Sequence, residues 1–340
     1  MATCGCGFTL AVTEDGRVHA WGRNCEGQLG TDTSDPGTCA YTVLPTPIVL
    51  PDPILQVSVG PFHAAGVAVD GSLYTWGRTQ GLQHQSGTPV RIGIHLFGDS
   101  RAVLVACGEF HTALLTEIGA VLTCGCGMHG KLGHGNEVSN WVLTQVPAEH
   151  FLVNEKQVRI VMIAAGGDNS IAIGEEGGFW GWGRGDCIGH GGIEDKFVPT
   201  PIELDHFGEK AIAKFISVGF EHSVAISDVD EVWAWGENSH GQLGLPMHMH
   251  ELKPIKLGSI AFWGTRVLSA SCGRHHTLAV TVTGTLWSWG KGGYGRLGLN
   301  DTCDRWVPRL VDKLNFGNAK IVSVAAGNCH SAVRIYTRVS

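Results

Sequence analysis

A glycine recurs along the chain at intervals close to fifty-four residues, mostly after a short apolar run. The successive intervals are 55, 48, 58, 53, 54 and 54 residues for Gly5, Gly60, Gly108, Gly166, Gly219, Gly273 and Gly327. Sixteen residues after each of the first six comes a second landmark followed by glycine: Trp21, Trp76, Cys124, Trp182, Trp235 and Trp289. A spacing kept in six copies identifies an internal repeat, and the repeat decides the fold class.

Each repeat contains four short apolar runs separated by glycine or other turn residues. In the fifth copy these runs occupy residues 215–218, 223–226, 231–235 and 254–257. Such runs of apolar and β-branched residues are typical of strands, and no segment shows a sustained helical period. Four-stranded units at a period of about fifty residues favour a propeller over a sandwich. We therefore predict an all-β propeller.

Tryptophans two residues apart mark the third strand of several repeats. Trp180 and Trp182 form one such pair, and Trp233 and Trp235 form another. Side chains two apart on a strand share a face, so both rings of a pair point at the same neighbouring blade. Burying one such ring removes roughly 150–250 Å² from water. These tryptophans are expected to form the core between blades.

The combined motif is Gly-x-x-His, then Trp-Gly, then Gly-x-Leu-Gly. Its best copies span residues 219–244 and 273–298, and it resembles the RCC1 repeat. The resemblance covers nearly the whole chain and implies a seven-bladed RCC1-like β-propeller over residues 1–340, as a single domain. Six repeats are complete, and the seventh is a C-terminal half repeat at residues 322–336.

This half repeat departs from the family pattern, in which both chain ends often share one blade. Here the N-terminus starts inside a first strand at Cys4 and Gly5, and no further Trp-Gly half follows residue 336. Either the chain is truncated or the seventh blade has two strands. A two-stranded blade leaves an unpaired edge, which invites pairing or instability.

Charge and composition bear on the partner and the compartment. The net charge is −7 and no run of Lys or Arg occurs, so nucleic acid is not expected as the partner. No window approaches eighteen apolar residues, so no membrane span is expected. The chain has eleven cysteines and its start does not resemble a signal peptide. A reducing compartment, cytoplasm or nucleus, is expected.

The recurrent histidines and cysteines could suggest a metal site. The histidines are His63, His111, His222, His276 and His330, one in each of five repeats, while Phe8 and Asn169 occupy this position in the first and fourth. They would lie far apart on the circle, so we interpret each as a buried side chain that bonds the backbone. Cys4, Cys107 and Cys272 share one repeat position that suits a small buried thiol. We predict no metal, no cofactor and no catalytic residues, since no nucleophile or phosphate-loop motif occurs.

The turn between the first and second strands of each repeat carries residues that folding does not require. These turns lie at one propeller face near the axis, and several carry Phe or an acid. Exposed aromatics with charged neighbours make a partner surface. The alternative is that the rings fold back onto neighbouring blades. The candidate partner-binding residues are Phe62, Glu109, Phe110, Asp168, Phe220, Glu221, Arg274 and His275.

The loop after Trp-Gly is expected towards the rim, as a solvated segment of mixed charge. Arg184 and Glu237 directly follow the Trp-Gly pair in their repeats. Such loops vary between repeats, and loops carry function on a rigid frame.

The family resemblance implies a non-catalytic protein-interaction scaffold that uses loops on one propeller face. The partner classes it implies are small GTPases and ubiquitin-pathway proteins. The alternative is a guanine-nucleotide exchange factor for a Ran-like GTPase, but neither a large loop insertion nor a basic tail is present. Relatives that sense UV-B light carry Gly-Trp-Arg-His at the turn. The turns here have no tryptophan, for example at residues 60–63 and 108–111.

Overall fold

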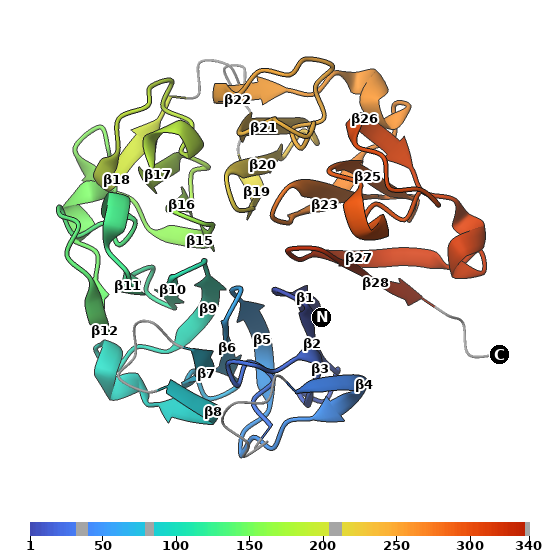
Figure 1. The fold of residues 1–340 in the computed structure, drawn as a ribbon. Coiled ribbons are helices and arrows are strands. Elements are labelled where there is room, and N and C mark those ends of the chain that lie inside the picture. The colour runs from blue at the N-terminus through green and yellow to red at the C-terminus, as the bar shows by residue number, and fades with distance from the viewer. Residues whose placement is uncertain (32–39, 79–84, 204–212, 337–340) are drawn as a thin grey trace.

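The computed structural model describes residues 1–31, 40–78, 85–203 and 213–336. Within these residues, short antiparallel strands form a ring of sheets around a central axis (Figure 1). The fold is an all-β propeller, as the repeat predicts. No helix in the described part of the chain has the length and hydropathy needed to cross a membrane.

Six sheets have four strands each and form the blades. The first three blades contain β1 (Ala2–Cys4), β2 (Phe8–Val12), β3 (Val18–Arg23) and β4 (Tyr41–Pro47); β5 (Ile54–Val59), β6 (His63–Ala68), β7 (Leu73–Arg78) and β8 (Gln85–Ile92); β9 (Ala102–Cys107), β10 (His111–Thr116), β11 (Val121–Gly125) and β12 (Asn140–Gln145). In each blade the first strand lies nearest the axis and the fourth lies at the rim (Figure 1).

The next three blades repeat this order. They contain β15 (Ile160–Ala165), β16 (Asn169–Gly174), β17 (Phe179–Gly183) and β18 (Lys196–Ile202); β19 (Ala213–Val218), β20 (His222–Ser227), β21 (Val232–Gly236) and β22 (Glu251–Lys256); β23 (Val267–Cys272), β24 (His276–Thr281), β25 (Leu286–Gly290) and β26 (Arg305–Leu310). The strands predicted for the fifth copy are thus confirmed, with ends displaced by up to three residues.

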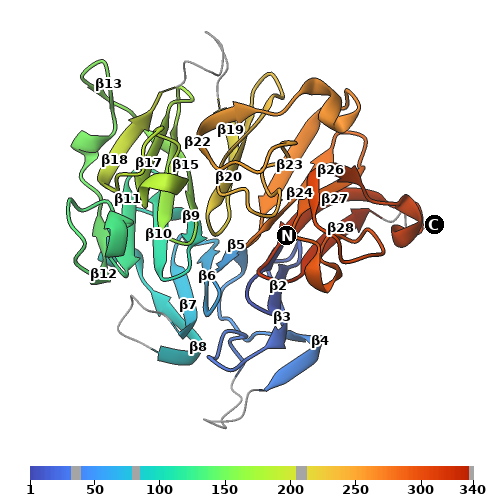
Figure 2. The same ribbon diagram turned by 45° about the horizontal axis from the view of Figure 1, so that its top comes forward.

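Two smaller sheets complete the strand inventory of the described residues. β13 (Leu152–Val153) and β14 (Lys156–Gln157) form a small hairpin, and β27 (Lys320–Ala326) pairs with β28 (Ser331–Tyr336). The connections include short 3₁₀ helices: η1 (Ile94–Phe97), η2 (Met128–Gly130), η3 (Ala148–His150), η4 (Gly185–Cys187), η5 (Ser259–Phe262), η6 (Gly293–Gly295) and η7 (Lys313–Phe316). The β27–β28 hairpin lies between the sixth blade and the first (Figures 1 and 2).

The hydrophobic core consists of clusters between neighbouring blades. Trp287 and Trp289 of β25 pack with Leu243 and Val224 of the fifth blade. The Trp289 indole N–H donates to the backbone carbonyl of Gln242 at 2.9 Å. A Cβ on Gly244 would lie 3.0 Å from that indole nitrogen, closer than an ordinary van der Waals contact, so glycine leaves room for the ring. The Trp-Gly and Gly-x-Leu-Gly motifs of successive repeats are therefore two halves of one contact.

The five recurrent histidines each join their repeat to the next blade, through hydroxyl groups rather than the expected backbone groups. The Nε2 atom of His111 lies 2.8 Å from Oγ of Ser170, whose hydroxyl donates to the carbonyl of Lys131. Because that hydroxyl proton is used, His111 donates through Nε2–H. Comparable pairs are His63 with Thr112, His222 with Thr277, His276 with Ser331, and His330 with Thr9.

The same contacts close the ring across the two ends of the chain. The backbone N–H of Asn328 donates to the carbonyl of Gly5 at 3.1 Å, just as Arg274 donates to Gly327. The Nε2 atom of His330 lies 3.0 Å from Oγ1 of Thr9. The β27–β28 hairpin therefore meets the first blade as any blade meets its neighbour near the axis.

Candidate functional site

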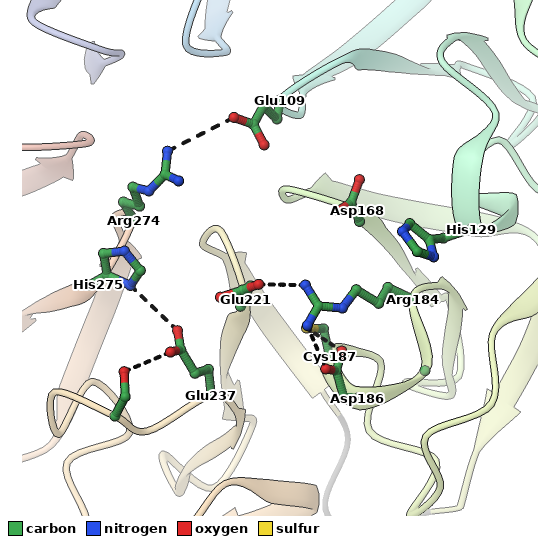
Figure 3. Close-up of polar contacts among 12 residues, drawn as sticks. Glu109, His129, Asp168, Arg184, Asp186, Cys187, Glu221, Glu237, Arg274 and His275 are labelled. Carbon is green, nitrogen blue, oxygen red and sulfur yellow. Dashed lines mark hydrogen bonds and ion pairs between the residues drawn. The ribbon is translucent and has the colours of Figure 1, made fainter.

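The turns between first and second strands gather at one end of the axis. We call this region the axial turn surface; it comprises residues 6–7, 61–62, 109–110, 167–168, 220–221, 274–275 and 328–329. All eight residues proposed from the sequence belong to it, and Figure 3 shows its charged members. The strand–turn–strand pattern of the repeat, predicted from glycine spacing, is what places them together.

Glycine at the start of each turn allows the blades to approach closely. A Cβ on Gly108 would lie 2.5 Å from the carbonyl oxygen of Gly166 in the next blade. The N–H of Glu109 donates to that carbonyl at 3.0 Å. The backbone beneath the axial turn surface is therefore fixed by contacts between blades.

The three phenylalanines are half-buried and contact neighbouring turns. The rings of Phe62 and Phe110 stack with centroids 6.1 Å apart. The guanidinium of Arg274 lies 4.0 Å from the centroid of Phe220, within cation–π range. His275 also contacts the Phe220 ring edge-on at 6.3 Å. These rings thus pack against adjacent turns and keep part of their surface in solvent.

Ion pairs connect turns that belong to different blades. An Nη of Arg274 lies 3.9 Å from a carboxylate oxygen of Glu109, which links the sixth blade to the third across the axis (Figure 3). Burial raises the pKa of Glu109, and the Arg274 charge opposes this rise. The nearby Asp168 accepts from the ammonium of Lys131 at 2.6 Å.

A second group of ion pairs lies around Glu221 and Glu237. Arg184 bridges Glu221 and Asp186, and Nδ1 of His275 lies 3.4 Å from Glu237 (Figure 3). The hydrogen bond with His275 lowers the pKa of Glu237, whereas burial raises the pKa of Glu221. The two carboxylates therefore differ in acidity although they are neighbours.

Three residues that contact the axial turn surface were not among the sequence candidates. Lys131, Arg184 and Glu237 come from the segments after Trp-Gly (Cys-Gly in the third repeat), which were expected towards the rim. The expectation was wrong for these residues, because they reach the axial turns. The antiparallel pairing of the second and third strands could have predicted their position, because it places the residue after Trp-Gly beside the turn. For example, the Arg184 N–H donates to the carbonyl of Asp168 at 2.9 Å. The residue after Trp-Gly is therefore always next to the turn in its own blade.

One group of possible metal ligands occurs in the described residues. A side-chain ligand atom from each of His129, Glu137 and Asp195 lies within 4.8 Å of the other two. Asp195 already accepts from the Gly185 N–H and lies 2.8 Å from Nδ1 of His129. The same arrangement recurs where Asp304 meets His240 and Gly292. We interpret this motif as a link between blades.

The axis contains a cavity of about 110 Å³ that is lined by the glycines after the first strands and by four cysteines, of which Cys4, Cys107 and Cys272 are buried. Burial raises the pKa of Cys4, Cys107 and Cys272 to about 12. Thiols with such values are almost entirely protonated near neutral pH and are weak nucleophiles. The cavity thiols therefore suit packing, as the repeat position predicts.

The chain resembles known proteins along nearly its whole length. The family model described as RCC1-like domain matches residues 1–333. The ultraviolet-B receptor UVR8 of Arabidopsis thaliana is 30% identical over 96% of this chain and 72% of the receptor. Human E3 ubiquitin-protein ligase HERC2 is 30% identical over 95% of this chain, which is 7% of the ligase.

Two further matches extend this comparison. Human regulator of chromosome condensation is 28% identical over 96% of this chain and 80% of that protein. The crystal structure of human WBSCR16 superposes with a TM-score of 0.85 at 25% identity, covering 99% of this chain and 87% of that one. The names of these proteins describe different functions. The resemblance therefore establishes the repeat architecture, and the function of this chain has to be inferred from its own surface residues.

Proposed function

The chain belongs to the RCC1-like domain family, and we propose that it is a non-catalytic scaffold that binds a protein partner through the axial turn surface. The observation that carries this proposal is the contact between Arg274 and Glu109 across the axis. The framework of tryptophans, histidines and glycines does not involve either side chain. Charged and aromatic groups that folding does not require, held on a rigid frame, suit protein recognition.

The chemistry of this surface supports binding rather than turnover. Its carboxylates pair with Arg, Lys or His, and its phenylalanines supply apolar area beside the charges. Paired Arg and aromatic side chains are typical binding hot spots. The buried His–hydroxyl pairs, such as His111 with Ser170, lie beneath the surface where a substrate would not reach them.

We propose further that the chain is one propeller domain of seven blades, in which β27–β28 is the inner half of the seventh. Support comes from the equivalence of its contacts with those of a complete blade. Ser331 accepts from His276 as Thr277 accepts from His222, and both hydroxyls donate to a Gly-x-Leu-Gly carbonyl of the preceding blade.

The names of the relatives suggest two partner classes. A ubiquitin-pathway protein would suit a domain like that of HERC2, and a small GTPase would suit the exchange activity that the family resemblance implies. Nucleotide exchange on a Ran-like GTPase is thus the alternative function. Release of labelled GDP from a panel of small GTPases distinguishes the two: a scaffold leaves the rates unchanged, whereas acceleration of any one establishes the exchange factor.

Variants of the axial turn surface test the scaffold function. Arg274→Ala and Glu221→Ala each remove one charge from the surface and should weaken partner capture about tenfold or more. Leu314→Ser is the control, because Leu314 is exposed on η7 and does not belong to the axial turn surface. Capture is quantified by mass spectrometry against wild type, with thermal midpoints measured for each variant. A partner captured equally by all four proteins would exclude this surface.

A further inference from the structure

Two links between neighbouring blades share a histidine–aspartate contact. Between the third and fourth blades, Nδ1 of His129 lies 2.8 Å from Oδ2 of Asp195. Between the fifth and sixth blades, Nδ1 of His240 lies 2.8 Å from Oδ2 of Asp304. Each histidine comes from the segment after the third strand of its blade, and each aspartate lies just before the fourth strand of the next blade. The two links are therefore structural equivalents.

The link between the third and fourth blades has an additional ligand group. One side-chain ligand atom from each of His129, Glu137 and Asp195 lies within 4.8 Å of the other two, and no other such trio occurs among the described residues. The carboxylate of Glu137 accepts from the backbone N–H of His129 at 3.0 Å, and that of Asp195 accepts from the N–H of Gly185 at 3.0 Å. A backbone donor thus orients each carboxylate, as is usual for metal ligands.

The equivalent link lacks this third ligand for a visible reason. Glu137 stands three residues before β12, and the residue three before β22 is His248. The ring of His248 packs on the indole of Trp306, with centroids 3.5 Å apart. It therefore does not join His240 and Asp304 in a trio. The molecule contains both a three-ligand link and a two-ligand link in the same structural setting.

The three-ligand link holds two like charges close together. No described Lys or Arg forms an ion pair with the carboxylate of Glu137 or Asp195, and the ion pair of Asp195 is with His129. Two carboxylates in one place repel each other, and a cation between them removes this repulsion. The charge arrangement therefore favours a bound cation.

The ligand types and their exposure indicate which cation fits. Imidazole with carboxylates suits zinc, whereas calcium and magnesium prefer oxygen ligands alone. The side chains of His129 and Asp195 are 33% and 27% exposed, and Glu137 lies on the surface. An ion can therefore enter from solvent, and water can fill a fourth coordination position.

We propose that His129, Glu137 and Asp195 bind a zinc ion that joins the third and fourth blades. Zinc bonds of about 2.0–2.2 Å in a tetrahedron place ligand atoms about 3.3–3.6 Å apart. The three atoms reach this spacing by small side-chain rotations, since the contact of His129 with Asp195 opens slightly and Glu137 moves inward. The inference does not depend on the proposed scaffold function.

The zinc site borders the axial turn surface. Lys131 comes two residues after His129 and binds the carboxylate of Asp168 (Figure 3 shows His129 and Asp168). Gly185, which orients the aspartate ligand, directly follows Arg184 of the ion pairs around Glu221 and Glu237. A bound ion therefore fixes the two segments that carry Lys131 and Arg184.

Calorimetric titration with zinc ion alone tests the proposal on the full chain after treatment with a chelator. We expect saturable binding at one ion per chain, and a thermal midpoint raised by a few degrees when zinc saturates the protein. Calcium at the same concentration should leave the midpoint unchanged. Cobalt bound in place of zinc should give a spectrum without thiolate charge transfer, which separates this site from binding by cysteines.

A matched set of variants locates the ion. Glu137→Gln keeps the shape of an exposed side chain and should weaken zinc binding about tenfold or more. Asp195→Asn should do the same, whereas Asp304→Asn, the identical change at the two-ligand link, should bind zinc as wild type does. If Asp195→Asn does not fold, Glu137→Gln decides alone.

Three results would each overturn the proposal. They are the absence of saturable zinc binding, equal zinc affinity of wild type and Glu137→Gln, and a cobalt spectrum that shows thiolate ligands. Loss of zinc binding in Asp304→Asn but not in Glu137→Gln would place the ion at the other link and would also overturn it.

Discussion

The Nε2 atom of His330 lies 3.0 Å from the hydroxyl oxygen of Thr9, and 321 residues of chain separate the two. This contact repeats the link found between His222 and Thr277, whose blades adjoin in sequence. Near the axis, the β27–β28 hairpin therefore contacts the first blade in the same way as each of these blades contacts the next. The ring closes by the same chemistry that joins its blades.

Thr9→Val should destabilise the ring at this closure. The substitution keeps the shape of the side chain but leaves the partly buried His330 without its hydroxyl partner, which costs about 1–3 kcal/mol. Denaturant unfolding at neutral pH measures the change. Thr302→Val is the control, since Thr302 is exposed. Equal, small changes in the two variants would show that the closure contributes little to stability.

Alanine at two equivalent glycines should separate packing strain from backbone strain. Gly244 and Gly298 have φ values of +77° and +67°, so alanine at either costs about 1–2 kcal/mol for its left-handed backbone. Only at Gly244 would the new Cβ also meet an indole, at 3.0 Å. Gly244→Ala should therefore lose roughly 1–3 kcal/mol more than Gly298→Ala. Thermal unfolding of both variants tests this, and equal losses would refute the indole contact.

Acid should destabilise the protein well above the range in which carboxylates titrate. Burial lowers the pKa of His111 and His222 to about 3 and that of His63 to about 4. In the unfolded chain these histidines bind protons below about pH 6.5, whereas in the folded chain their imidazoles stay neutral until the pH approaches their lowered pKa values. Stability should thus fall as pH drops from about 6.5 towards about 3.

The variant His222→Gln isolates one of these histidines. It should reduce the slope of unfolding free energy against pH by about 1.4 kcal/mol per pH unit below pH 6. Denaturant midpoints between pH 7 and pH 5 measure the slope while most carboxylates remain ionised. A slope identical to that of wild type would mean that His222 takes up a proton in the folded state.

Thiol labelling should distinguish the buried cysteines near the axis from the exposed Cys303. Cys303 is exposed, whereas Cys4, Cys107 and Cys272 are buried with pKa values raised to about 12. A maleimide or disulfide reagent at neutral pH should modify Cys303 first and the three axial thiols only on unfolding. Peptide mapping of the labelled sites checks the order, and early labelling of Cys107 would contradict the buried assignment.

The sequence predicted the blades because their period comes from local contacts. Glycine turns, the sixteen-residue step from Gly219 to Trp235 and the pairing of Trp233 with Trp235 all lie within one repeat. Contacts between different repeats were harder to predict from the sequence. The histidine partners are hydroxyls of the next blade, about fifty-five residues away, as for His222 and Thr277.

The sequence predicted where the turn residues of the candidate surface lie, but not which side chains pair with one another. Its turn residues follow from the repeat, whereas the reach of Lys131 and Arg184 depends on side-chain direction and on neighbours in other turns. The ion pair between Arg274 and Glu109 joins the sixth blade to the third, and no pattern within a single repeat encodes it.

The bond from Asn328 to the carbonyl of Gly5 also has a consequence for how the molecule is made. β1 is synthesised before the other strands described here, and β27 and β28, which shield its free side, are synthesised after them. Until residue 328 has emerged from the ribosome, β27 and β28 cannot cover this flank of the first blade. Biosynthesis therefore exposes this flank longest, and chaperones that recognise apolar strands would meet it there.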